Sequence, residues 1–298
     1  MTQTVQSDSK SIVVRSTNIV LVDVVRAVAG EWAASRPGLK SRNVELTLRA
    51  AEQFRGKLDP PPAGEVQVSI TQFDYAGELR MQPLPGVWPG VPLAAGMSLV
   101  IYSSSQDARI EKVIDAATLV VEAETVLSGL RIVSKAESQN LHLDAVLALA
   151  APEAPKLDSS FADFMWAEYG DQALASVNQF NLLADFTERK DLTIETRQSF
   201  LKGGYDLVGL HGDGTPALAQ RLARTMVHLL TIPGTEDLHE NLIETFLPNL
   251  LGITSELPPQ KSADVFRDHE TDRAALDAFL RHDKTEAGAV LLKWLHQK

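Results

Sequence analysis

A glycine-rich turn between an apolar run and a helix start is the clearest chemical feature of this sequence. Residues 205–222 read YDLVGLHGDGTPALAQRL. The pattern predicts a buried strand over 205–210, a turn made of Gly212, Asp213, Gly214 and Thr215, and a helix that begins at residue 216. A strand, a glycine turn and a helix start direct free backbone N–H groups and the positive end of a helix dipole at an anion. The stretch therefore offers a phosphate-binding site.

These residues resemble the Gly-Gly-Asp-Gly-Thr/Ser motif of the phosphofructokinases, diacylglycerol kinases and NAD kinases. In the phosphofructokinases a Pro-Gly-Thr-Ile-Asp-Asn-Asp segment follows, and IPGTED at 232–237 is similar to its beginning. The resemblance covers about 35 residues. It implies a kinase-like enzyme in which Asp213 is the magnesium-side acid and Asp237 the catalytic base. The sequence departs from the first motif at His211, which replaces a glycine, and from the second at Glu236 and Leu238.

Helix initiation explains the same residues without a ligand. Thr215 as N-cap with Pro216 at the first helical position begins one helix. Thr235 as N-cap, with Glu236 and Asp237 in the first turn, begins another, where carboxylates favour the helix dipole. This is the interpretation that we favour, and the phosphate site at Gly212, Gly214 and Thr215 is the alternative.

Other catalytic signatures are incomplete or missing. The seven histidines fall neither in His-x-His nor in His-Glu-x-x-His spacing, and the chain has no cysteine. These absences predict no metal site. The sequence also contains no Gly-x-Ser-x-Gly, Gly-x-Gly-x-x-Gly or Gly-x-x-x-x-Gly-Lys-Ser/Thr motif, which are the common nucleophile and nucleotide signals. We therefore expect no cofactor, and we lean away from an enzyme.

Charge differs between the two halves of the chain. Residues 1–150 carry 14 basic and 16 acidic side chains, and residues 151–298 carry 14 and 23, so the acidic excess lies in the second half. Residues 8–57 are mildly basic, which leaves a nucleic-acid surface open as an alternative. Solvated surface residues are the interpretation that we favour. The candidate phosphate contacts are Arg36, Lys40, Arg42, Arg49, Arg55 and Lys57.

Composition indicates a soluble globular protein. The 298 residues are 44% hydrophobic, which is enough to bury one large core or two modest ones. The polar N-terminus shows no signal peptide, and no apolar stretch is long enough to cross a membrane. We expect a soluble, acidic protein in the cytoplasm or another intracellular compartment, with no membrane partner.

Periodicity predicts a mixed first half and a helical second half. Apolar residues at helical spacing predict helices over 21–32, 41–56, 109–130 and 141–150. A strand at residues 117–124, ATLVVEAE, is the alternative within the third of these, although a helix fits the pattern better. Alternation predicts a β-hairpin over 65–82, and a third strand is expected over 97–102. Residues 151–160 are the best linker candidate, so we expect a domain at 1–150 and a helical domain at 151–298.

The predicted fold class is therefore α-rich α+β, mostly helical with a small antiparallel β element near residues 65–102. The function that we expect is a non-catalytic assembly or interaction protein, most concretely a coat-like or nucleocapsid-like structural subunit. We expect a homo-oligomer, since the loose N-terminus and the proline-rich loop at 83–92 have little to bury alone.

Overall fold

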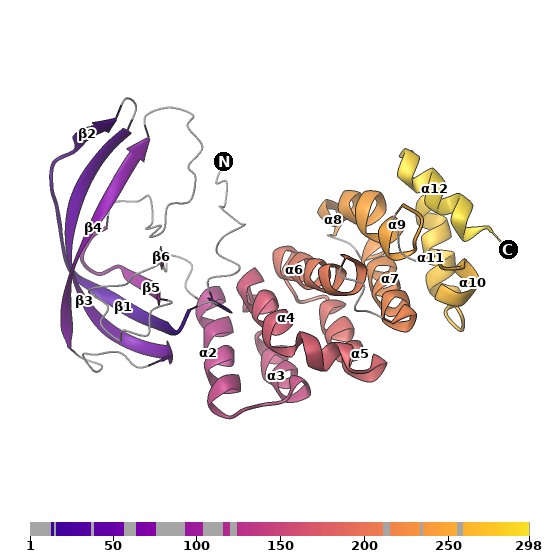
Figure 1. The fold of residues 1–298 in the computed structure, drawn as a ribbon, viewed down its shortest axis with the longest axis horizontal. Coiled ribbons are helices and arrows are strands. Elements are labelled where there is room, and N and C mark those ends of the chain that lie inside the picture. Colours follow the sequence, from indigo (N-terminus) through magenta and orange to yellow (C-terminus); the bar gives the residue numbers. More distant parts are fainter. Residues whose placement is uncertain are drawn as a thin grey trace. The chain divides into compact units, whose positions relative to one another are not determined.

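A computed structural model describes most of the chain. The described residues are 13–14, 16–36, 39–56, 64–75, 93–103, 116–119, 124–210, 215–232, 235–254 and 259–297. The chain divides into two compact units, residues 1–134 and 135–298. The first contains an antiparallel sheet and the second is helical (Figure 1), which confirms the predicted α+β, mostly helical fold class. The predicted domain boundary at residues 150 and 151 stays a prediction. No described helix is both long and apolar enough to span a bilayer.

The described strands of the first unit form one curled, six-stranded antiparallel sheet. Its path runs β2, β3, β1, β5 and β6, and β4 pairs with β3. The strands are β1 (Asn18–Ala29), β2 (Ala33–Arg36), β3 (Leu39–Arg55), β4 (Glu65–Tyr75), β5 (Ser98–Ser103) and β6 (Ala116–Leu119).

This sheet is larger than the predicted β element, because residues 21–32 and 41–56 are mainly strand and the two helices predicted there are wrong. In β3 the buried Val44, Leu46 and Leu48 alternate with the more exposed Glu45 and Thr47. A period of two places alternate side chains on one face of a strand, so this is the pattern of a half-buried strand.

Strand β1 imitates a helical period because its pairing is irregular. Val20, Val22 and Val24 are buried at every second position, but the register against β3 shifts between Val24 and Arg26. Such a bulge inserts an extra residue and breaks the alternation. Apolar residues after the shift, such as Val28, therefore fall at spacings that look helical.

The remaining elements of the first unit agree only in part with the prediction. Strand β5 confirms the strand expected over 97–102, and β4 corresponds to the first strand of the hairpin expected over 65–82. The second strand of that hairpin lies outside the described residues. The helix expected over 109–130 is wrong at β6, while its last residues belong to α2 (Glu124–Ser138).

Both faces of the sheet bury apolar side chains. On one face Val22, Leu46 and Leu99 belong to a cluster shared by β1, β3, β4 and β5. On the other, Phe54 and Val100 pack in a cluster with Leu127 and Leu130 of α2. Arg131 of α2 also bonds Glu52 of β3 through both carboxylate oxygens, at 3.0 and 2.8 Å. Helix α2 therefore fixes one end of the sheet.

The second unit is built from helices, as the sequence predicts. Many of their buried side chains form one apolar cluster, which includes the fully buried Met226, Leu229 and Leu250. Further buried apolar side chains, such as Leu143 of α3 and Phe164 of α4, lie outside that cluster. The elements are α3 (Leu143–Ala150), η1 (Ala151–Lys156), α4 (Ser159–Leu174), α5 (Val177–Thr187), α6 (Ile194–Tyr205), η2 (Asp206–Leu210), α7 (Pro216–Leu230), α8 (Glu236–Asn241), η3 (Leu242–Phe246), α9 (Leu247–Leu250), α10 (Ser262–Val265), α11 (Glu270–Leu280) and α12 (Glu286–Leu295).

Residues 151–160, the expected linker, form η1 and the start of α4. Ala154 and Leu157 are fully buried, and the Thr196 hydroxyl donates to the Leu157 carbonyl at 2.6 Å. Two prolines in this segment suit a short 3-10 turn, where few backbone N–H groups are needed. The segment is therefore a folded part of the helical unit.

A glycine pair inside α6 makes room for a tryptophan. The sequence suggests that Gly203 and Gly204 end a helix, but both lie within α6. The Trp166 indole donates its Nε1–H to the Phe200 carbonyl at 2.9 Å, and its ring lies where a Cβ on either glycine would project. Their lack of a side chain is thus a packing requirement.

Candidate functional site

The end of the long β1–β3 hairpin is the most distinctive surface of the first unit. Strand β5 pairs with β1 only as far as Asp23, and the next backbone bonds join Val24 to Met97 and Gly96. Beyond Val24, β1 still pairs with β3 along one edge, but no described strand pairs with its other edge. We call residues 25–36 and 39–42 the hairpin tip. A strand edge of this kind, unpaired among the described residues, is a template for association with another chain.

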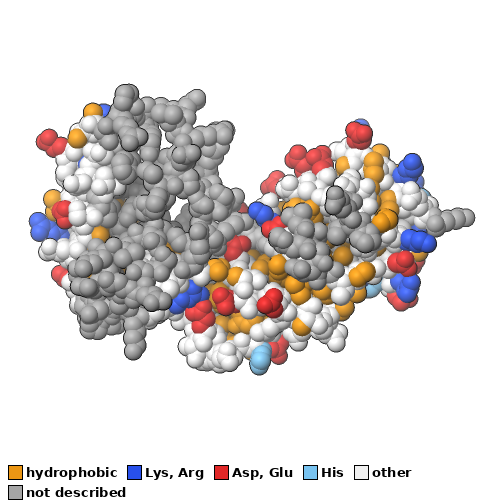
Figure 2. Space-filling model, viewed as in Figure 1, with side chains coloured by type: hydrophobic (Ala, Val, Ile, Leu, Met, Phe, Trp, Pro, Cys, Tyr) orange, Lys and Arg blue, Asp and Glu red, His pale blue; other side chains and the backbone are white. Residues whose placement is uncertain are grey.

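The hairpin tip exposes large apolar side chains. Val25, Val28 and Trp32 are 36%, 45% and 41% exposed, and they are the exposed large hydrophobic residues among those described in the first unit. The Arg42 guanidinium carbon lies 4.5 Å from the centre of the Trp32 ring, which holds the indole by a cation–π contact. Hydrophobic side chains are visible at the end of the sheet where β2 lies (Figure 2).

Below the tip, the outer face of the sheet is polar and internally paired. Arg49 contacts Glu65 at 2.6 Å, Ser69 donates to Glu45 at 2.6 Å, and Ser98 donates to Asp23 at 2.7 Å. Such exposed cross-strand pairs are typical of a solvated sheet surface. Among the described residues of the first unit, the exposed large apolar side chains therefore lie at the tip.

The structure does not gather the predicted nucleic-acid contacts on one face. Lys40 and Arg42 lie at the tip, whereas Arg49 falls on the opposite face of β3, since odd and even positions alternate there. Arg55 donates to the carbonyls of Val13 and Ser16, so it anchors the chain before β1. Of the other two, Arg36 is in β2 and Lys57 lies outside the described residues.

The glycine-rich turn begins after a helix. Gly212, Asp213 and Gly214 lie outside the described residues, as does the proline-rich loop at 83–92. The strand predicted over 205–210 is wrong, because Tyr205 ends α6 and the next five residues form the π-helical turn η2. A phosphate site made of a strand, a turn and a helix needs a strand before the turn. That position is occupied by the π-helical turn η2 instead. Asp237 is exposed in the first turn of α8.

Both predicted helix starts are confirmed, but neither threonine caps in the expected way. Thr215 occupies the N-cap position of α7 with Pro216 next, yet its side chain makes no capping hydrogen bond. Thr235 precedes α8 and is fully buried. Its hydroxyl lies 2.6 Å from the carbonyls of Leu229 and Ile232, so it satisfies the end of α7 and does not cap α8.

A second π-helical turn meets η2 inside the helical unit. Tyr205, just before η2, stacks on Phe246 of η3 with ring centres 4.5 Å apart. Asn249 donates to the Tyr205 hydroxyl at 2.6 Å and accepts from Thr254 at the same distance. Although π-helical turns often mark functional sites, these polar groups satisfy one another, so the arrangement is a packed junction.

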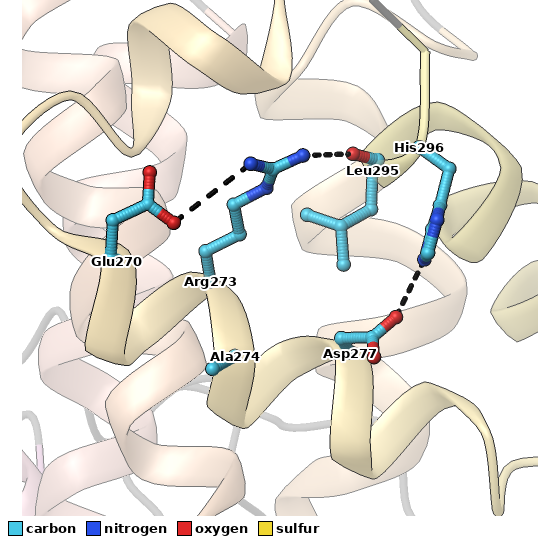
Figure 3. A pocket seen from close by; sticks show the side chains of 6 residues that line it. All are labelled: Glu270, Arg273, Ala274, Asp277, Leu295 and His296. Atoms are coloured by element: carbon cyan, nitrogen blue, oxygen red, sulfur yellow. Dashed lines mark hydrogen bonds and ion pairs between the residues drawn. The ribbon is translucent and has the colours of Figure 1, made fainter.

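A shallow pocket of about 210 Å³ lies between α11 and the end of α12 (Figure 3). His296 Nε2 lies 2.6 Å from Asp277 Oδ1, and Arg281 donates its Nε–H to Asp277 at 2.7 Å. Hydrogen bonds from Arg281 and then His296 lower the pKa of the Asp277 carboxyl. Arg273 donates to the Leu295 carbonyl at 3.2 Å.

These contacts join the end of α12 to α11. An Asp–His pair can orient an imidazole for proton transfer, but the six residues that line this pocket include no hydroxyl nucleophile. The described residues also contain no group of three or more His, Cys, Asp or Glu side chains placed to hold a metal ion. The geometry therefore supports a structural role for the pair.

The sequence analysis did not predict that apolar residues of the hairpin tip are exposed on the surface. Val25, Val28 and Trp32 were predicted to form the apolar side of a helix, whereas they are exposed. The run of β-branched valines from Val20 to Val28 is the signal that favours a strand. The chain matches no protein-family model, no curated protein and no solved structure.

Proposed function

We propose that this protein is a non-catalytic assembly or interaction protein, in its most concrete form a coat-like or nucleocapsid-like subunit, and that it contacts its partner through the hairpin tip. The observation that carries the proposal is the exposure of Val25, Val28 and Trp32 beside a strand edge that no described strand pairs with. Exposed large apolar side chains and unpaired strand edges both favour association with another chain.

The geometry of Trp32 strengthens this proposal. A tryptophan is an effective interface anchor when its ring is buried by a partner. Contact with Arg42 already holds the ring, so less side-chain freedom is lost when it binds. The tip thus presents an apolar anchor that is ordered before the partner arrives.

Light scattering over a concentration series tests the proposal. We expect the mass to rise above the 32.5 kDa of one chain as the concentration increases. Trp32→Thr removes the anchor, and a loss of about 2 kcal/mol corresponds to a roughly 30-fold weaker association. Val28→Thr keeps a β-branched residue in the strand and should also weaken association.

Val290→Thr is the matched control, because Val290 is 42% exposed but lies on α12. We expect it to associate as the wild type does. A wild type that stays monomeric at every concentration contradicts self-assembly. Association that survives the loss of both Trp32 and Val28 contradicts the role of the tip.

A further inference from the structure

We propose that the partner of the hairpin tip is a second copy of this chain, and that the two copies pair edge to edge, with one β1 antiparallel to the other and Val28 opposite Val28. This inference rests on the proposed function and adds the identity of the partner and the register of the contact. The paired segment is residues 26–30 of each copy.

The hydrogen bonds between β1 and β3 decide which residues of β1 bond across its other edge. Gly30 donates its backbone N–H to the Asn43 carbonyl of β3. Along an antiparallel strand, hydrogen-bonded and non-hydrogen-bonded positions alternate. Ala27 and Ala29 therefore direct their N–H and C=O groups away from β3. On that side neither residue has a backbone partner in the part of the chain that the structure describes.

Both ends of the paired segment are fixed by the strand itself. Val24 already exchanges backbone bonds with residues 96 and 97 at the start of β5, so pairing with another chain stops before it. Val25 has no partner in the register against β3, as expected of the extra residue at a bulge. At the other end, β1 finishes at Ala29 and Gly30 makes its last bond to β3. An antiparallel pair centred on Val28 uses this whole segment.

Pairing around Val28 satisfies both outward-facing alanines. Ala27 of each copy lies opposite Ala29 of the other, and the two residues exchange both backbone hydrogen bonds. Val28 then faces its own copy at a non-hydrogen-bonded position, where opposite side chains are closest. The exposed valines of the two copies therefore bury each other on the face of the sheet that carries Glu45.

Charge favours the same register. Arg26 of each copy lies opposite Gly30 of the other and beside its Glu31. Both charged residues are exposed, and neither forms an ion pair among the described residues. Opposite charges thus lie side by side at each end of the contact, and no like charges face each other. Residues 25–30 also contain no lysine or proline, the residues with which edge strands commonly resist pairing.

The register also gives Trp32 a place in the contact. Beyond Gly30, each chain runs toward the point where Val24 of the other copy bonds the start of β5. Met97 is half-buried there and the neighbouring Ala94 is exposed, so the indole meets an apolar surface. Val28 and Trp32 therefore contribute to one contact. Because the contact is the same from both sides, it is isologous and joins two copies, and a larger assembly requires a second surface.

Cross-linking through a single cysteine tests the register, because the natural chain has none. In the proposed pair the two Cα atoms at position 28 are about 4.5 Å apart, a distance that a disulfide spans. We expect mild oxidation of the Val28→Cys protein by dissolved oxygen to give mostly a covalent dimer on a non-reducing gel, which a thiol reductant returns to single chains.

Two exposed positions provide matched controls for the cross-link. Arg26→Cys places the thiol on the same strand, but in this register the two copies of position 26 are about 14 Å apart. Val290→Cys places it at an exposed valine of α12. We expect little cross-linking of either variant under the conditions that link Val28→Cys. Cross-linking of Arg26→Cys as complete as that of Val28→Cys overturns the register.

Ala29→Pro tests the backbone bonds. The Ala29 N–H points away from β3, so proline removes no described hydrogen bond of the single chain, and edge strands tolerate it. In the pair it removes one bond from each copy, which corresponds to about 30-fold weaker association by light scattering. Ala29→Ser keeps the N–H and should associate as the wild type does. Thermal unfolding shows whether both variants are folded; if the proline variant is not, cross-linking at position 28 decides.

The outcomes separate this inference from the proposed function. Wild-type association that requires Trp32 but survives Ala29→Pro, without a cross-link through Val28→Cys, overturns the edge pairing and leaves the interaction role of the tip. A strand of a different protein would then be the occupant of the edge. A wild type that stays monomeric at every concentration, with no cross-link at position 28, contradicts both the inference and the self-assembly on which it rests.

Discussion

Replacing Gly203 by alanine should destabilise the helical unit, although alanine is the better helix former. A Cβ at this position would lie 2.6 Å from both Cγ and Nε1 of Trp166, far inside van der Waals contact. Overpacking of a well-filled site costs about 1–3 kcal/mol. Displacing the indole also weakens its hydrogen bond to the Phe200 carbonyl, worth about 1 kcal/mol.

Alanine is favoured over glycine inside a helix, which adds back about 1 kcal/mol to the free energy of unfolding. The expected net result for Gly203→Ala is therefore a loss of about 2–3 kcal/mol in the free energy of unfolding, since the overlap involves a rigid ring and lies at the upper end of the range. Urea unfolding followed by circular dichroism measures it.

Gly204→Ala is the matched control within the same helix. Its Cβ would lie 3.1 Å from Trp166 Cζ2 and 3.4 Å from Leu222 Cδ1, so a small shift accommodates it. We expect a change below about 1 kcal/mol, because the strain and the gain in helix propensity nearly cancel. Combining Gly203→Ala with Trp166→Leu should recover part of the loss. A Gly203→Ala protein as stable as the wild type would refute this account of the glycine pair.

Three further substitutions test the helix starts and the half-buried His239. Thr215→Ala should cost less than the usual N-cap loss of about 1 kcal/mol, because its side chain makes no capping bond; a full loss in chemical unfolding would contradict this. Thr235→Val should cost about 1–3 kcal/mol, because it leaves buried carbonyls without their hydroxyl partner. Near-wild-type stability would show that the hydroxyl is dispensable. Burial lowers the pKa of His239 below its ordinary 6.5. The unfolded chain therefore binds the proton first, and unfolding scans should show stability falling as pH drops through 6.5 and levelling off below the folded pKa. His239→Gln should remove that part of the pH dependence, and an identical profile would exclude the histidine as its source.

The second unit was largely predictable from the sequence because its signals are local. Val177, Phe180 and Phe186 recur at helical spacing in α5, and Pro216 begins α7 as its fixed backbone angle favours. Each of these patterns depends on residues within a few turns of one another. The helical period of their apolar residues therefore identifies these elements without knowledge of what they pack against.

The sheet was harder to predict, because its strands pair with residues far away in the sequence. In these strands the pattern of apolar residues fits both a helix and a strand. Val44 and Leu48 fit a helix at a spacing of four, but the intervening Leu46 is also buried and completes an alternation. In β1 the shift after Val24 mixes the two periods. A period of two and a period of 3.6 share many positions, so only strand pairing over long sequence distances decided between them.

The sequence by itself determined the mostly helical α+β class, the acidic second half and the basic segment near the N-terminus. Composition and local periodicity suffice for these properties, since neither depends on the path of the chain. Only the tertiary structure decided that Trp32 is exposed beside Arg42, that Arg55 donates to the carbonyls of Val13 and Ser16, and that Thr235 is buried. Exposure and contact depend on segments that are remote in the sequence, so folding alone establishes which side chains remain on the surface.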